Sequence, residues 1–538
     1  MLERDPLNRV SDPATFWTTV NATEALPGTT TPLTWSFYDD ATELALRGTF
    51  AEIGALAQAQ ARRDRLPSAV DGRFVGIFLG HPAANMTRFR LMADLTPGGS
   101  GDALERQFFG TKRSGVAPVR SKRRYPAVAA RLPVAAARAP GRIRTGYHDV
   151  DSWWRALVAG PALTPARARA LLPAAADRYR AVLHWHGVGT MITQGVFDQL
   201  SRLAAAHGRP GLELELVAGL DELSETDVLD DLWQVSRDRL PLAEALRRHG
   251  CHARDAGELS VRSWREDATQ PLAAVAQYRG MAERQSPKRS AARSAAAAAE
   301  ARARFLAGLG RAERGRARLL VALARRYLPL REVGRGGLLR ALDAGRMAAR
   351  VLGADLHRRD LLASPDDVFF LTMTELGAAP GPGLADEVAR RRARYAEYAE
   401  LELPESWFGN PAPTARPTEF SPAATGRGSL AGVAACAGSV TGPARVVHGP
   451  DEVDLEPGEV LVCHTTDPSW ASLMSLAAGL VIDVGGPLSH GAIVARELGV
   501  PCVIGTRDGT RVIRTGDLVH VDGTTGVVTV KDSQERTP

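Results

Sequence analysis

One histidine near the end of the chain, His490, stands where phosphoryl chemistry is favoured. It follows a turn made by Gly485, Gly486 and Pro487 and comes directly after Ser489, a residue type that often begins a helix. Backbone N–H groups at a helix start, together with the helix dipole, attract anions. A histidine in this position can carry a phosphoryl group as a covalent intermediate, although a histidine that only helps to cap a helix is the commoner arrangement.

The residues on either side predict the elements that position this histidine. Residues 480–484 are apolar except for Asp483, which predicts a short buried strand. Apolar residues at helical spacing then predict a helix over residues 490–498, ended by a glycine. A second strand is predicted over residues 500–504. The histidine therefore belongs to a strand, turn, helix and strand unit.

A second polar segment, residues 250–267, interrupts a region with a helical pattern. It brings His252, Glu258 and Arg265 close together in sequence. A histidine, a carboxylate and an arginine can together bind an anion or move a proton. A surface loop held by salt bridges is an equally common meaning of such a set, and the residues alone leave both open.

Two arginines further along the chain, Arg331 and Arg335, would share one helix face if residues 331–335 are helical. Like charges on one face repel each other unless an anion lies between them. This favours a bound phosphate or an acidic substrate group. Neutralisation by acidic side chains elsewhere in the fold is the alternative.

Near the N-terminus, Trp35 lies in the string TPLTWSF, which follows a Pro-Gly turn. A threonine before this tryptophan predicts the start of a helix. The aromatic cluster is suited to lining an apolar pocket, and ordinary core packing is the alternative.

Length and composition limit the protein class. The chain has 538 residues, 44% of them hydrophobic, which is enough for two or three domains. The formal charge of +6 is modest, and the basic run 111–146 contains one aromatic residue, so we expect no nucleic-acid partner. The four cysteines follow no metal-ligand or disulfide spacing, and neither a signal peptide nor a membrane span is visible. These features favour a cytoplasmic protein without a metal site of its own.

The composition changes along the chain and predicts its organisation. Residues 1–404 are mainly helical, with a mixed α/β pattern over residues 1–110. The alanine-rich stretch 290–303 lacks large apolar side chains and is typical of an exposed helix. Five prolines without a helical period predict a linker over residues 405–430, counted with the proline just before it. Residues 431–532 are β-rich and predict a compact α/β domain that ends in a hairpin.

The string around His490, GG-x-x-SH-x-AIVAREL-G-x-P-x-VIG, is long and specific. It resembles the active-site signature of the swivelling phosphohistidine domain of PEP-utilising enzymes, which also occurs in rifampicin phosphotransferases. The resemblance implies that His490 is the phosphocarrier and that residues 431–532 form the swivelling domain. The residues that it implies in support of the phosphate are Gly485, Gly486, Ser489 and Arg496.

Four shorter strings resemble other parts of rifampicin phosphotransferases. They are E-x-LPG-x-x-TPLTWSF, the G-x-H…GEL…RxWRED segment, LRE and DDVFFLT. The resemblance implies that residues 1–404 form a substrate-binding domain in which Glu258 or His252 acts as a base. The residues implied to bind substrate are Trp35, Arg265, Arg331 and Arg335.

The phosphoryl donor is expected on another chain. ATP-dependent members of this family carry an ATP-grasp domain ahead of these parts, whereas this sequence begins at the substrate-domain motif and contains no P-loop string. We therefore expect an ATP-grasp protein, similar to the N-terminal part of PEP synthase, to supply ATP and Mg²⁺ in trans.

The function implied is that of a phosphotransferase component with a dikinase-like mechanism, passing phosphate from His490 to a hydroxyl of a small organic molecule. Two alternatives stay open. One is a small-molecule binding or regulatory module that transfers no phosphate. The other is a biosynthetic dehydratase or cyclase that acts through a phosphorylated intermediate.

Overall fold

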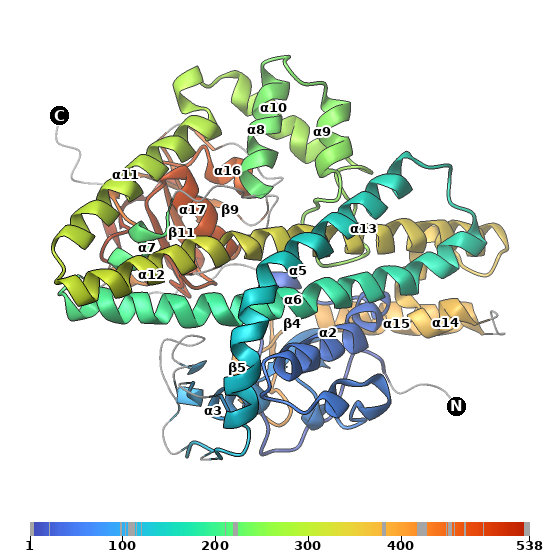
Figure 1. Cartoon of the computed structure of the whole chain (residues 1–538). Coiled ribbons are helices and arrows are strands. Elements are labelled where there is room, and N and C mark those ends of the chain that lie inside the picture. The colour runs from blue at the N-terminus through green and yellow to red at the C-terminus, as the bar shows by residue number, and fades with distance from the viewer. Residues whose placement is uncertain are drawn as a thin grey trace. The chain divides into compact units, whose positions relative to one another are not determined.

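The computed structural model describes most of the chain between residues 5 and 531. Within that range, the residues outside the description are 21, 97–98, 103, 106–112, 114–115, 120, 210, 219–223, 379–382, 417–427, 448, 450–454, 457, 467–469 and 488. Figure 1 gives the order of the elements along the chain.

The chain folds into two compact units that are interleaved in sequence. The first unit holds residues 1–190, 255–262 and 333–416, and the second holds residues 191–254, 263–332 and 417–538. Two long helices, α6 (Pro165–Ala206) and α13 (Pro329–Arg358), contribute residues to both units. The predicted helical part and the β-rich C-terminal part are both present. The helical residues, however, are shared between the two units.

The first unit combines helices with a small antiparallel sheet. The sheet has the strand order β2-β3-β1-β5. Its strands are β1 (Phe16–Thr18), β2 (Val75–Phe78), β3 (His81–Asn85) and β5 (Ser406–Phe408). The helices of this unit are α1 (Ala22–Ala25), α2 (Pro32–Glu52), α3 (Met86–Asp94), α5 (Tyr125–Ala159), α14 (Met373–Gly377) and α15 (Leu384–Ala399). The mixed pattern predicted for residues 1–110 is present in this sheet and in α2 and α3.

The predicted linker is partly built into this unit. Strand β5 pairs with β1, and Trp407 at its centre is buried in an apolar cluster with Trp17 and Phe78. Strand β4 (Leu401–Glu402) pairs with β6 (Thr414–Ala415). Residues 405–416 therefore belong to the first unit, because a buried tryptophan and backbone pairing hold them. Residues 417–427 lie outside the described part.

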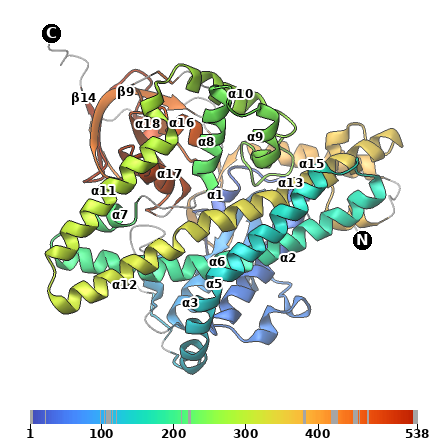
Figure 2. The same cartoon turned by 45° about the horizontal axis from the view of Figure 1, so that its top comes forward.

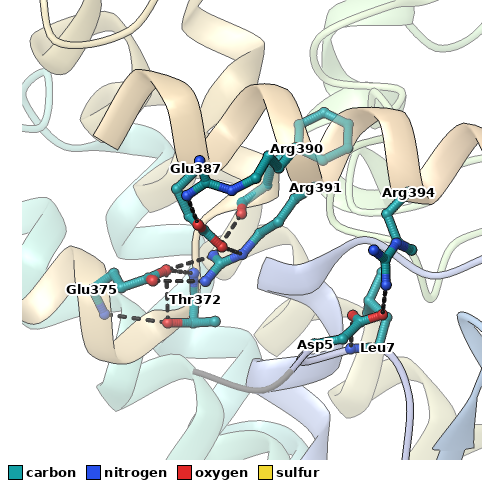
Figure 3. A network of polar contacts seen from close by, with 9 residues as sticks. Asp5, Leu7, Thr372, Glu375, Glu387, Arg390, Arg391 and Arg394 are labelled. Carbon is teal, nitrogen blue, oxygen red and sulfur yellow. Dashed lines mark hydrogen bonds and ion pairs between the residues drawn. The ribbon is translucent and has the colours of Figure 1, made fainter. Parts of the chain in front are cut away.

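A polar network holds the C-terminal helices of the first unit together (Figure 3). Arg391 of α15 donates from both terminal nitrogens to Glu375 of α14, at 2.7 and 2.8 Å. Thr372 caps α14, and its backbone N–H donates to Glu375 at 2.8 Å. Two-point arginine–carboxylate pairs fix the relative direction of the groups that they join. This segment, which includes the DDVFFLT string, therefore has a structural role, because its contacts hold α14 and α15 together.

The second unit contains the large sheet. Its strand order is β7-β14-β13-β9-β10-β11-β12-β8. The strands are β7 (Ser429–Ala431), β8 (Val433–Cys436), β9 (Ser439–Val447), β10 (Val460–Cys463), β11 (Gly479–Ile482), β12 (Cys502–Ile504), β13 (Leu518–Asp522) and β14 (Val527–Lys531). Strands β9 to β12 are parallel neighbours, and the remaining pairs are antiparallel. The predicted C-terminal hairpin is confirmed as β13 and β14.

Helices complete the second unit. Three of them follow strands of the sheet: α16 (Ala471–Met474), α17 (His490–Leu498) and α18 (Gly509–Val512). The others are α7 (Leu212–Leu216), α8 (Ser224–Ser236), α9 (Leu242–His249), α10 (Thr269–Arg279), α11 (Pro287–Ala307) and α12 (Arg311–Tyr327). The carboxyl ends of parallel strands meet at one edge of a sheet, and loops at that edge commonly carry the functional groups of α/β proteins. The loops after β10 and β11 both lie at this edge.

Candidate active site

His490 is the first residue of α17, as the sequence predicts. Ser489 is the N-cap, and its hydroxyl accepts a hydrogen bond from the backbone N–H of Ala492 at 3.4 Å. His490 is only 5% exposed. Because the helix starts at the imidazole, the first-turn N–H groups and the positive end of the helix dipole lie beside it. This geometry suits a group that becomes negatively charged.

The two glycines before the helix, Gly485 and Gly486, differ in whether their position requires a glycine. Gly485 has a φ of +137°, and an added Cβ would lie 2.6 Å from the side chain of Ile504 and 3.0 Å from the Ser489 hydroxyl. Gly486 has ordinary backbone, and an added Cβ would meet nothing within 4 Å. Only Gly485 is therefore required by the turn that leads into α17. Nothing in the immediate surroundings of Gly486 demands a glycine.

A buried carboxylate faces the histidine. The Oε2 atom of Glu332, in the first turn of α13, lies 3.5 Å from Nδ1 of His490, and the two side chains are only 4% and 3% exposed. The sequence argument singled out Arg331 and Arg335 for their spacing and overlooked the glutamate between them. The sequence signal that could have identified Glu332 is the same LRE string, in which a carboxylate stands next to an arginine at a helix start. The glutamate thus belongs to the surroundings of His490.

Arg496 holds the loop before α17. It is fully buried, and its Nη1 donates to the carbonyl oxygens of Pro487, at 2.8 Å, and Ala435, at 3.1 Å. Burial lowers the pKa of the Arg496 guanidinium, although neighbouring acidic groups oppose this, and the positive charge of Arg331 lowers the pKa further. Its predicted support of a phosphate is thus indirect: it ties the glycine turn to strand β8. The influence of Arg331 places both cations in one electrostatic neighbourhood.

A further buried carboxylate, Asp483, organises the same edge of the sheet and was not predicted as a site residue. It accepts hydrogen bonds from the Thr506 hydroxyl at 2.8 Å and from the Thr510 hydroxyl and N–H at 2.5 and 3.1 Å. His464, in the loop after β10, places Nδ1 3.7 Å from it. Burial raises the pKa of Asp483, but hydrogen bonds from His464, Thr510 and Thr506 outweigh this and keep the pKa below its ordinary value. An ionised Asp483 therefore anchors three loops.

His252 and Arg265, both in the second unit, lie in the polar segment between α9 and α10. The His252 ring is buried and stacks on Trp264, with ring centroids 5.0 Å apart. The Trp264 backbone N–H donates to the His252 carbonyl at 2.8 Å. Arg265 is half-buried, and its backbone N–H donates to the Gly250 carbonyl at 3.1 Å. These contacts are those of a well-packed loop.

Glu258, Trp35 and Arg335 belong to the first unit. The Glu258 carboxylate accepts hydrogen bonds from the backbone N–H groups of Thr31 and Ser260, at 3.1 and 3.0 Å, and from the hydroxyls of Thr31 and Thr34, at 2.7 and 2.5 Å. It therefore fastens its loop to the start of α2. Trp35 is 4% exposed within the main apolar cluster of this unit, and Arg335 is half-buried on α13.

The predicted residues thus fall into two groups. The second unit brings together His490, Gly485, Gly486, Ser489 and Arg496 at one sheet edge, and Arg331 belongs to the same unit. His252 and Arg265 lie in another loop of that unit, and Trp35, Glu258 and Arg335 lie in the first unit. Within the residues described here, no three His, Cys, Asp or Glu side chains are placed to hold a metal ion. No helix among the described residues is both long and apolar enough to cross a membrane.

Two family models match parts of the chain. Residues 455–526 match the mobile domain of PEP-utilising enzymes, and residues 159–332 match the fourth domain of rifampicin phosphotransferase. The resemblance predicted from the sequence is confirmed in these two regions. The first region contains His490, and the second ends at Glu332.

Curated relatives match part of the chain at moderate identity. An uncharacterised protein of Mycobacterium tuberculosis is 39% identical over 215 residues, which cover 40% of this chain and 25% of that protein. A rifampicin phosphotransferase of a Streptomyces species is 36% identical over 214 residues, covering 39% of this chain and 24% of the relative. The uncharacterised phosphotransferase YvkC of Bacillus subtilis is 34% identical over 202 residues, covering 35% and 24%. The chain therefore matches about a quarter of the length of these relatives.

A solved structure of Enzyme I was also found. It aligns with a TM-score of 0.15 and 20% identity, covering 36% of this chain and 54% of that one. A likeness of this size supports no argument about the fold, which is therefore described from the structure alone.

Proposed function

From the match to the mobile domain of PEP-utilising enzymes, we propose that this chain is a phosphotransferase component in which His490 carries the phosphoryl group. One observation supports this above the others: an imidazole at a helix start, after a turn that requires glycine at residue 485, lies 3.5 Å from a buried carboxylate. A helix that only needed a cap would use Ser489 for that purpose and would not need a histidine enclosed beside a glutamate.

The loading step we propose takes place at Nε2 of His490. Before the donor is met, Glu332 approaches Nδ1, and a carboxylate on that side favours the tautomer whose Nε2 carries a lone pair. This nitrogen attacks the phosphorus of the donor, a P–N bond forms, and the donor's bridging bond breaks. We propose an ATP-grasp protein as the donor, with ATP and Mg²⁺ bound to that protein rather than to this chain.

The second proposed step passes the phosphoryl group to an alcohol. The acceptor hydroxyl attacks phosphorus, a P–O bond forms, the P–N bond to His490 breaks, and the hydroxyl proton must go to a base. Such a base has to lie within hydrogen-bond reach of an acceptor that itself touches the phosphoryl group. Glu332 is the buried carboxylate beside His490, whereas Glu258 already accepts four hydrogen bonds within the first unit. We therefore propose Glu332 as the base, ahead of Glu258 and His252.

The acceptor class we propose is a small organic molecule with a hydroxyl group. Rifampicin is the first compound to test, because two relatives that match part of this chain are named as its phosphotransferases. The identity of the true acceptor is a separate question from the carrier role of His490.

The deciding experiment follows phosphate on the full-length chain. Incubation with labelled ATP alone is expected to leave the chain unlabelled, and addition of an ATP-grasp protein from the same organism is expected to place acid-labile, base-stable phosphate on His490. The H490A variant should remain unlabelled under both conditions. Strong labelling by ATP alone would contradict a donor in trans, and labelling of H490A would contradict the carrier role.

A further inference from the structure

We propose that the packed face of helix α11, called the seat below, holds α17 in place. Ser294 on this face positions His490 by a hydrogen bond to the far end of α17. The proposal rests on the carrier role of His490 for its functional meaning. The seat itself is argued from contacts within the second unit.

The alanine-rich part of α11 is exposed on one side, as its composition predicts, and packed on the other. Ala298 and Ala301 are buried, and α11 packs against α17 and α7 (Figure 2). Residues 291, 294, 298 and 301 recur at spacings of three and four, so that they share one face of α11. Small side chains on that face let two helix backbones approach closely. The composition predicts the exposed face, but it does not predict the packed one, because large apolar residues are the usual sign of burial.

One hydrogen bond joins the seat to the carrier helix. The Ser294 hydroxyl donates to the backbone carbonyl of Arg496 at 2.6 Å. This carbonyl lies in the last turn of α17, where it also accepts the backbone N–H of the C-cap residue Gly499 at 3.3 Å. Ser294 therefore acts at one end of a nine-residue helix whose other end is His490.

One face of α17 contacts helices of the second unit along its whole length. His490, Ile493, Val494 and Glu497 follow the i, i+3, i+4 and i+7 pattern of a single face. Ile493 joins an apolar cluster with Phe305 of α11 and Leu328 of α12's C-cap, while Glu497 lines the same small hollow as Ala291. The carrier helix is thus packed between its own sheet and the helical part of the unit. Contacts at both ends, with Glu332 and with Ser294, define its rotation about its axis.

This arrangement has a direct consequence for access. The His490 side chain is enclosed when α17 is seated, so a phosphoryl donor must reach it after α17 leaves the seat. Weakening the seat is therefore expected to speed chemical loading of His490 from solution and to slow delivery to an acceptor near Glu332. Opposite effects on the two half-reactions distinguish a positioning residue from one that only stabilises the fold.

The test uses full-length protein and potassium phosphoramidate, a small donor that transfers its phosphoryl group to imidazole with release of ammonia. Ser294→Leu places a branched side chain against α17 and should raise the initial rate of His490 labelling about tenfold. Ser294→Ala removes only the hydrogen bond and should raise the rate about two- to tenfold, the range expected for one such bond. Ala296→Leu, on an exposed position of the same helix, is the matched control and should label like the wild type.

Labelling rates equal to the wild type in both Ser294 variants, with circular dichroism and melting temperature unchanged, would overturn the proposal. A second probe keeps this conclusion separate from the carrier role. Carbethoxylation of His490 by diethyl pyrocarbonate, followed by peptide mass spectrometry, reports its exposure without any phosphoryl transfer. Faster carbethoxylation in Ser294→Leu supports the seat even if no variant accepts phosphate, in which case the carrier role alone would be at fault.

Discussion

Two buried glutamates, Glu258 in the first unit and Glu332 in the second, show what separates a structural carboxylate from a candidate for chemistry. Glu258 accepts four hydrogen bonds from backbone and threonine donors, which hold a loop against the start of α2. Glu332 lies instead at 3.5 Å from the imidazole of His490. Burial is nearly equal in the two, so the partners of each carboxylate, and not its burial, indicate its role.

The contrast between Glu258 and Glu332 depends on His490 being the phosphoryl carrier. The His490→Ala substitution removes the proposed carrier nitrogen and is expected to abolish the acid-labile phosphate that an ATP-grasp donor places on the chain, because the P–N bond forms at that nitrogen. The measurement is phosphate on the intact protein after incubation with the ATP-grasp donor. The His464→Ala variant, which alters an exposed histidine at the same sheet edge, is the control and should keep its label.

The next largest effect is expected at Glu332. Glu332→Gln keeps the shape of the side chain but removes the base, so transfer from phosphorylated His490 to an acceptor such as rifampicin should fall about a hundredfold or more. Single-turnover kinetics on protein that has already been loaded measure this step alone. If loading and transfer fall equally, Glu332 orients the ring and does not act as the acceptor-side base.

The matching change in the first unit should affect stability instead. Glu258→Gln replaces one carboxylate oxygen by an NH₂ group that faces donors, and a buried polar group that loses its partner costs about 1–3 kcal/mol. Chemical denaturation should therefore show a lower free energy of unfolding, while transfer from His490 stays within about twofold of wild type in protein that is folded. A large loss of transfer with unchanged stability would reverse the roles of the two glutamates.

A smaller effect tests the turn that aims His490. Gly485→Ala forces a side chain onto a φ of +137° and is expected to cost about 1 kcal/mol or more, whereas Gly486→Ala should be nearly neutral because space is open there. Thermal melts of the two variants give the difference directly. Equal destabilisation by both would mean that the turn adopts another conformation in solution.

The smallest expected effect concerns Asp483, a third buried carboxylate that resembles Glu258 in its many donors. Its pKa is lowered in the folded protein, so its stabilising contribution is complete above the unfolded value near 3.8 and is lost as the pH falls through the folded pKa. Asp483→Asn should therefore lower stability at neutral pH and lessen the loss of stability on acidification below about pH 4. Denaturation curves at pH 7 and pH 3.5 measure both. A variant whose acid sensitivity equals that of the wild type would exclude this assignment.

Local sequence determined the carrier unit almost completely. The order of apolar strand, Gly485 turn, Ser489 cap and helix to Leu498 depends on neighbours within about 25 residues, and short-range preferences decide such elements. The C-terminal hairpin and the absence of a long apolar helix among the described residues followed from the same kind of information. The strings around His490 also sufficed to predict the match to the mobile domain.

Tertiary structure decided which distant residues meet that unit. The approach of Glu332 to His490 joins residues 158 positions apart in the chain, and no local pattern records it. The same holds for the packing of one face of the alanine-rich α11 and for the pairing of β5, the strand of Trp407, with β1 inside the predicted linker. Helical spacing singled out Arg331 and Arg335 as a pair. Which side chain of a helix faces a partner depends, however, on the direction of the helix in space. That direction is set by packing between segments far apart in sequence.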